Sequence, residues 1–207
     1  MALKKYEDLT DIHLDVLKEV GNIGSGNAST ALSAMIGKNV LIEMPKVKLL
    51  DFQDAIDQAG GAESVIVGIL VRLNGDIDGM IMFLLEQQFA EIIIKTFFGK
   101  EHLDLLALDE NDISALSEIG NIMASSYVSA IAQLAGMEIG VEAPSLTVDM
   151  LGAVMSVPAI EFGEVSDKLL FIDKSLKVDD VSIKSNMMLI PTVDSLAKLL
   201  GKLGVEA

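Results

Sequence analysis

The stretch DVLKEVGNIGSGNASTALSAMIGKNVLIEMP, residues 15–45, decides the fold because it returns 99 residues later as SALSEIGNIMASSYVSAIAQLAGMEIGVEAP, residues 114–144. The two copies align without a gap, and many of the pairs that differ are conservative. The identical pairs are Leu17/Leu116, Glu19/Glu118, Gly21/Gly120, Asn22/Asn121, Ile23/Ile122, Ala31/Ala130, Gly37/Gly136, Glu43/Glu142 and Pro45/Pro144. An ungapped repeat of this length predicts an internal duplication of one structural unit.

Each copy is predicted to begin as a long helix. Apolar residues recur at helical spacing in the first copy, at Ile12, Val16, Val20 and Ile23. Most of the helix circumference is therefore expected to be buried. Both helices are expected to end near a glycine, Gly37 or Gly136, because glycine suits the left-handed position that closes a helix.

Local patterns predict the remaining elements. The first half is expected to contain a strand over 39–50 with Pro45 inside it, a hairpin of strands over 64–73 and 77–85, and an amphipathic helix over 87–98. The second half is expected to contain strands over 137–148, 168–172 and 186–190 and a final helix over 192–203. Residues 149–155 have no clear pattern and stay unassigned.

These elements place the chain in the α+β class. Each half leaves an apolar helix face and a short sheet uncovered, so we expect the halves to pack together. The prediction is a single domain, residues 1–207, made of two repeats at about 10–100 and about 109–205, which pseudo-two-fold symmetry relates. The two long helices would pack with a multi-stranded sheet.

The composition limits the possible partners. Of 207 residues, 31 are acidic and 15 are basic, and the formal net charge is −16. Nucleic acids and anionic membrane surfaces bind basic proteins, so neither is an expected partner. The apolar runs are far shorter than the roughly 18 residues of a membrane span, and the first residues lack the apolar core of a signal peptide. We therefore expect a cytoplasmic protein without membrane insertion.

The absence of cysteine limits the chemistry. It excludes disulfides, thiol nucleophiles and zinc–thiolate sites, and two histidines, His13 and His102, do not make a plausible metal site. The chain is expected to hold no metal and no cofactor of its own. Its chemistry would come from carboxylates, amides and hydroxyls.

Polar residues form one narrow stripe on each predicted helix. At roughly 100° per residue, Asp15, Glu19 and Asn22 fall within about 60° of one another, opposite the apolar face. The matching stripe in the second copy consists of Ser114, Glu118 and Asn121. Each helix therefore presents a carboxylate beside an amide on a rigid element, which suits the binding of a partner.

A proline is expected to lie beside each Glu–Asn pair. From Asn22 the helix rises about 21 Å, and the following strand returns about 20 Å, at 1.5 Å and 3.3 Å per residue respectively. Pro45 therefore comes back level with Asn22, and the same count places Pro144 beside Asn121. These residues predict two equivalent surface sites.

Structural interpretations of these residues compete with the functional one. A glutamate on a helix is usually a solvated charge, an asparagine beside glycine is usually a cap or turn residue, and duplication alone can preserve a structural unit. The run GNIGSGN, residues 21–27, is not a phosphate-binding P-loop, because no strand precedes it and the lysine with serine or threonine is missing. Its glycines instead let another helix, or a partner protein, come close.

The two motifs resemble the signature of the CheC/CheX/FliY phosphatases of bacterial and archaeal chemotaxis. Both copies have the form [Asp/Ser]-xxx-Glu-xx-Asn followed by proline after 22 further residues, and the flanking sequences strengthen the resemblance. Two motifs without a C-terminal flagellar-switch domain resemble the CheC branch. The resemblance implies a CheC-like fold over essentially the whole chain.

The resemblance also implies an activity, hydrolysis of the phosphoaspartate on the response regulator CheY. Glu19 and Glu118 would pair with a lysine of the regulator, while Asn22 and Asn121 would orient water for in-line attack. Mg²⁺ would be held by the regulator. A second implied partner is the receptor deamidase CheD, bound through residues 146–155 including Asp149. The family pattern suggests a monomer.

Two other functional classes compete with the phosphatase. A non-catalytic binding module would regulate CheD or act as a flagellar-switch scaffold like the middle domain of FliM, which shares the fold by resemblance. Glu and Asn in both copies argue against this class, because a scaffold does not need them. A hydrolase of small phosphorylated metabolites fits poorly, since the sequence contains no recognisable metal cluster, nucleophile or phosphate cradle.

Overall fold

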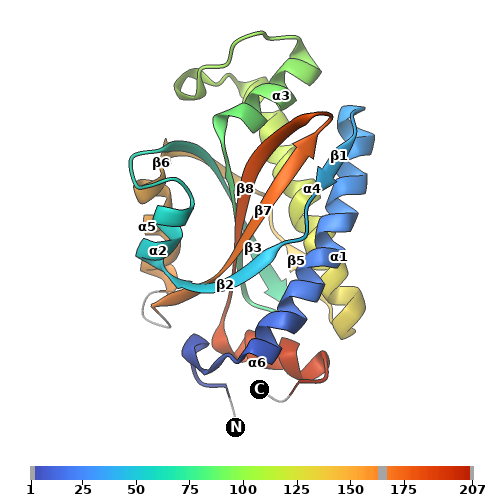
Figure 1. Ribbon diagram of the computed structural model, residues 1–207, viewed down its shortest axis with the longest axis vertical. Coiled ribbons are helices and arrows are strands. Elements are labelled where there is room, and N and C mark those ends of the chain that lie inside the picture. Colours follow the sequence, from blue (N-terminus) through green and yellow to red (C-terminus); the bar gives the residue numbers. More distant parts are fainter. Residues whose placement is uncertain (1–2, 163–166, 206–207) are drawn as a thin grey trace.

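The computed structural model describes residues 3–162 and 167–205, and the two halves of the chain have the same order of elements (Figure 1). After a short 3₁₀ helix, Tyr6–Asp8, the first half contains α1 Asp11–Ile36, β1 Val40–Ile42, β2 Lys46–Asp51, α2 Phe52–Gln58, β3 Val65–Gly75, β4 Gly79–Leu85 and α3 Gln87–Phe98. A second 3₁₀ helix, Leu105–Ala107, leads to α4 Glu110–Ala135, β5 Ile139–Val141, β6 Ser145–Met150, α5 Leu151–Phe162, β7 Lys168–Val178, β8 Val181–Pro191 and α6 Val193–Lys202.

One antiparallel sheet of eight strands contains strands from both halves. Its order is β1-β7-β8-β4-β3-β5, with β2 also paired to β7 and β6 also paired to β3. The short strands of each half thus pair with the hairpin of the other half, and β4 and β8 pair at the centre with Met82 opposite Met188. The α+β class predicted from the sequence is confirmed, and the pairing joins the halves into one body.

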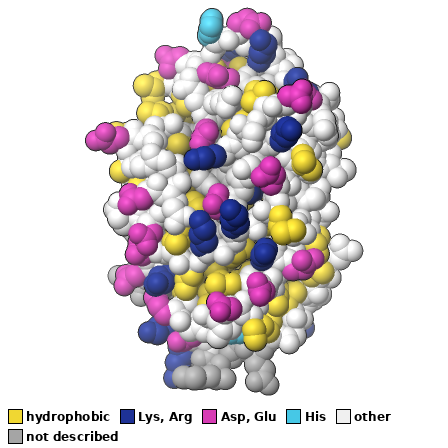
Figure 2. All heavy atoms as spheres, viewed as in Figure 1, with side chains coloured by type: hydrophobic (Ala, Val, Ile, Leu, Met, Phe, Trp, Pro, Cys, Tyr) yellow, Lys and Arg dark blue, Asp and Glu magenta, His cyan; other side chains and the backbone are white. Residues whose placement is uncertain are grey.

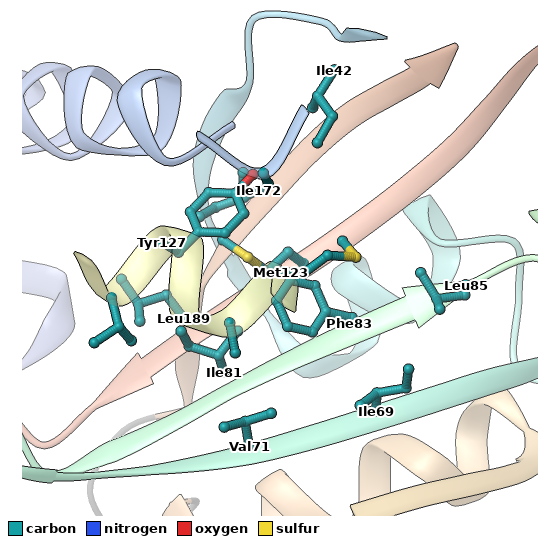
Figure 3. Packing of buried hydrophobic residues seen from close by; sticks show 14 of the residues in the cluster. Ile42, Ile69, Val71, Ile81, Phe83, Leu85, Met123, Tyr127, Ile172 and Leu189 are labelled. Atoms are coloured by element: carbon teal, nitrogen blue, oxygen red, sulfur yellow. The ribbon is translucent and has the colours of Figure 1, made fainter. Parts of the chain in front are cut away.

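Helices cover both faces of the curled sheet. The long helices α1 and α4 lie side by side on one face, and the short helices α2 and α5 lie on the other (Figure 1). Between the long helices and the sheet, Phe83 of β4 packs with Met123 and Tyr127 of α4 and with aliphatic side chains of the sheet (Figure 3). None of the helices in residues 3–162 and 167–205 has the length and apolar composition that a membrane span requires.

Both long helices end where the sequence predicts. Gly37 and Gly136 have left-handed backbone conformations, with φ of 65° and 60°, and donate their N–H groups to Ser33 and Ala132. These closures turn the chain back along each helix, so that the returning strand passes beside its outer face.

The predicted strands after the long helices are each broken in two. Residues 43–45 separate β1 from β2, and residues 142–144 separate β5 from β6. Pro45 and Pro144 lie at these breaks, because proline has no N–H to donate to a neighbouring strand. Residues 149–155, which show no clear sequence pattern, contain the end of β6 and the start of α5, and α2 is an element that the sequence patterns do not predict.

Tyr6 makes the stability of the fold sensitive to high pH. Its buried hydroxyl donates to the carbonyl of Pro191 over 2.6 Å, and burial raises the pKa of Tyr6 far above its usual range. Above pH about 10 the unfolded chain releases this proton while the folded chain keeps it, so the stability falls by up to about 1.4 kcal/mol per pH unit. We expect Tyr6→Phe to remove this component of the slope in urea unfolding between pH 9 and 11. Equal slopes for the two proteins would contradict the assignment.

Candidate functional site

The polar stripes predicted from the sequence lie on the outer faces of α1 and α4. In α1, Asp15 and Glu19 are exposed and Asn22 is half-buried, while Leu17 and Val20 on the other side are buried. In α4, the matching residues Ser114 and Glu118 are exposed and Asn121 is half-buried. We call Asp15, Glu19, Asn22 and Pro45 the first site, and Ser114, Glu118, Asn121 and Pro144 the second site.

The polar side chains of both sites are uncommitted within the protein. Among the described residues, the side chains of Glu19, Asn22, Glu118 and Asn121 take part in no hydrogen bond or ion pair. Ion pairs of the described chain lie elsewhere, and acidic and basic side chains are interspersed over the face seen in Figure 2. These carboxylates and amides are free to bind groups of another molecule.

The returning strand of the first half is held against α1. The backbone N–H of Val40 donates to the Ser33 hydroxyl over 2.9 Å, and that of Ile42 donates to the Ser29 hydroxyl over 2.8 Å. The chain then reaches Pro45, whose Cγ lies 3.4 Å from where a Cβ of Gly21 would be. Pro45 therefore packs beside the residue that precedes Asn22, as the residue count predicts. Pro144 is half-buried at the corresponding break of the second half.

A buried contact fixes α1 to α4 one turn beyond Asn22. A Cβ atom at Gly24 would overlap the ring of Tyr127, so the two helices approach closely at this glycine. The Tyr127 hydroxyl lies 2.7 Å from the Ser25 hydroxyl and accepts a hydrogen bond from Lys174 Nζ over 2.8 Å. This network sets the relative positions of the helices that carry the two sites.

Lys174 was not anticipated from the sequence. It is only 2% exposed, and its ammonium lies 4.6 Å and 5.6 Å from the ring centroids of Tyr127 and Phe83. Within the described residues its charge has no carboxylate partner. The sequence feature that hints at a buried polar contact here is Tyr127, a large residue with a hydroxyl at the position where the first copy has Ala28.

Asp149, the residue predicted to contact CheD, lies away from both Glu–Asn pairs. It is exposed near the end of β6, and it borders a cavity of about 440 Å³ between β3, β6 and α5. Arg72 at this cavity donates two hydrogen bonds to Glu161, of 2.8 Å and 2.6 Å, which hold the pKa of Glu161 below its usual range.

The described residues include no group of three or more histidine or acidic side chains placed to hold a metal ion.

The comparison with known sequences connects these features to one family. A profile of the CheC-like family matches residues 12–49 and 113–148, the stretches that contain the two motifs. The chain is 32% identical to the CheY-P phosphatase CheC of Bacillus subtilis, over 97% of this chain and 98% of the relative.

Solved structures share the fold. The FliY of Thermotoga maritima matches with a TM-score of 0.76 at 21% identity, covering 95% of this chain and 98% of that one. The FliM middle domain of H. pylori matches with a TM-score of 0.66 at 11% identity, covering 94% and 99%. The family profile and the 32% identity to the Bacillus protein over nearly its full length establish that the chain is a member of the CheC-like family.

Proposed function

We propose that this protein hydrolyses the phosphoaspartate of the response regulator CheY at two sites. The observation that carries the proposal is the pair of matching Glu–Asn stripes on α1 and α4, whose polar groups are uncommitted within the described chain. Their exposure and their lack of contacts within the described chain leave these groups available to a partner. The relative named a CheY-P phosphatase, with 32% identity over nearly the full length, supports the same activity.

The proposed reaction requires only a carboxylate and an amide from this chain at each site. Phosphoryl transfer depends mainly on positioning and on neutralising charge. The regulator would supply the acyl phosphate, a Mg²⁺ ion and a lysine beside the phosphoryl group. Glu19 or Glu118 would pair with that lysine and set the register of docking, which places the neighbouring amide over the phosphoryl group.

An amide suits the second role. Asn22 or Asn121 can donate one hydrogen bond and accept another, so it can hold water in line with the phosphorus–oxygen bond that breaks. A carboxylate in the same place would bring negative charge next to the phosphoryl group and would repel it. The half-buried positions of Asn22 and Asn121 limit the motion of their side chains, which favours a defined orientation.

The experiment that tests the proposal follows the decay of phosphorylated CheY. With one molecule of this protein to about ten of regulator, we expect faster decay and release of more than one phosphate per chain, as catalysis requires. Buffer and heat-inactivated protein serve as controls. Decay that stays unchanged across the candidate CheY regulators would contradict the proposal.

A binding role toward CheD is the second candidate, supported by the exposed Asp149 and the adjacent cavity. The fold shared with the FliM middle domain is also compatible with a scaffold role. Both roles are compatible with a monomer, and we also propose that the protein is monomeric and cytoplasmic. Tight capture of CheD together with negligible phosphatase activity would favour this candidate, whereas loss of capture in Asp149→Lys alone would locate the surface.

A further inference from the structure

Gly26 is a helical glycine that this chain does not require. It lies inside the 26-residue helix α1, it is exposed, and its backbone has no positive φ. A Cβ atom added to it would meet nothing within 4 Å. Glycine is a poor helix former because it loses the most backbone freedom on folding, so an exposed glycine in the middle of a long helix is a candidate for contact with another molecule.

The neighbouring glycines have reasons within the described structure. Gly24 admits the ring of Tyr127, and Gly21 lies beside Pro45. Gly26 differs from both because no part of the described chain occupies the space above it. The close approach that a glycine permits is therefore available there to another molecule.

The position of Gly26 connects that space to the first site. At 100° per residue, Gly26 points between Glu19 and Asn22, and it lies one turn beyond Asn22 along α1. The Thr30 hydroxyl of the next turn donates back to the Gly26 carbonyl over 3.1 Å. Because Gly26 has no side chain and no neighbour within 4 Å of its Cβ position, the helix surface is recessed at this point.

An exposed methionine flanks the same turn. Met44 is 65% exposed and lies between Ile42, which is tied to Ser29, and Pro45, which packs beside Gly21. The loop that carries Met44 therefore passes alongside the turn of α1 that holds Asn22. The matching residues of the second site are Ser125 for Gly26 and Ala143 for Met44.

We propose that Gly26 is a positioning residue of the first site, where a main-chain segment of the phosphorylated regulator packs closely on α1. This inference rests on the proposed function and extends it. The partner surface that fits has a cation for Glu19, main chain over Gly26 and an apolar side chain for the adaptable Met44. A side chain at position 26 would hold the regulator away from α1 and weaken its docking at the first site.

The test uses the full chain with the second site disabled by Glu118→Ala and Asn121→Ala. In this background we expect Gly26→Leu to raise the KM for phosphorylated CheY at least about tenfold, with little change in kcat. Gly26→Ala is expected to raise the Tm by about 2–4 °C, because alanine is the better helix former. A merely structural glycine would allow greater stability in Gly26→Ala but would not weaken docking in Gly26→Leu.

Gly201 provides the matched control. It is exposed in the last turn of α6 rather than in the middle of a helix, and a Cβ there would also meet nothing within 4 Å. Gly201→Leu should leave KM unchanged. An unchanged KM for Gly26→Leu in an active background would overturn the role of Gly26 while leaving the phosphatase intact. If the Glu118→Ala/Asn121→Ala protein has no activity, catalysis at the first site is contradicted, and the role of Gly26 is contradicted as well.

Discussion

Replacing Asn22 and Asn121 together by alanine is expected to lower the rate of CheY phosphoaspartate hydrolysis at least about a hundredfold. Both amides are the groups that we assign to the attacking water, so each site loses its orienting residue. Each single substitution should leave one working site. The measurement is the decay of phosphorylated CheY at equal concentrations of each variant.

The fold should survive this double substitution. Within the described residues neither amide makes a hydrogen bond, and alanine is favoured in helices. The matched control is Asn27→Ala, because this exposed asparagine lies on α1 and points away from the polar stripe. Full activity in the Asn22/Asn121 double variant, or equal loss in the control, would contradict the assignment.

Tyr127→Phe is expected to lower the free energy of unfolding by about 2–3 kcal/mol, the contribution of a hydrogen bond to a charged group. The substitution removes a hydroxyl that accepts a hydrogen bond from the buried ammonium of Lys174 and also pairs with Ser25. A buried charge without its partner is costly, whereas the loss of the hydroxyl volume alone is small. Urea unfolding at neutral pH measures the difference.

A second substitution distinguishes the buried charge from simple packing. With Lys174→Met added, no ammonium needs a partner, and the Ser25 hydroxyl can bond to a carbonyl one turn back in its helix. We expect the Tyr127→Phe/Lys174→Met protein to recover most of the stability that Tyr127→Phe loses. A double variant that is destabilised by the sum of the two single changes would contradict this explanation.

The long helices and their polar stripes could be predicted from the sequence because their signals are local. Apolar spacing places Val20 inside and Glu19 outside, and Gly37 closes the helix, although Ile12 of the same pattern is exposed in the first turn. Even the return of Pro45 to the level of Asn22 follows from the rise of a helix and a strand. Because helices and strands have a regular rise per residue, counting residues gives reliable relative positions over one helix and the strand that follows it.

The elements on the other face of the sheet could not be predicted in the same way. Helix α5 is apolar on nearly every side and contains Pro158, so it shows no helical period. Strands β7 and β8 extend beyond the predicted ranges, partly because Lys174 interrupts the apolar pattern although it is buried. The partner that buries it, Tyr127, is 47 residues away in the sequence. Contacts of this kind depend on tertiary packing.

Binding stoichiometry tests the central claim of two docking sites most directly. CheY loaded with Mg²⁺ and beryllium fluoride, an unreactive mimic of the phosphoryl group, would be titrated into this protein in a calorimeter. We predict two regulators bound per chain, and one per chain in either the Glu19→Ala/Asn22→Ala or the Glu118→Ala/Asn121→Ala variant. No binding by the unmodified protein, or two regulators still bound when all four residues are replaced, would contradict the account.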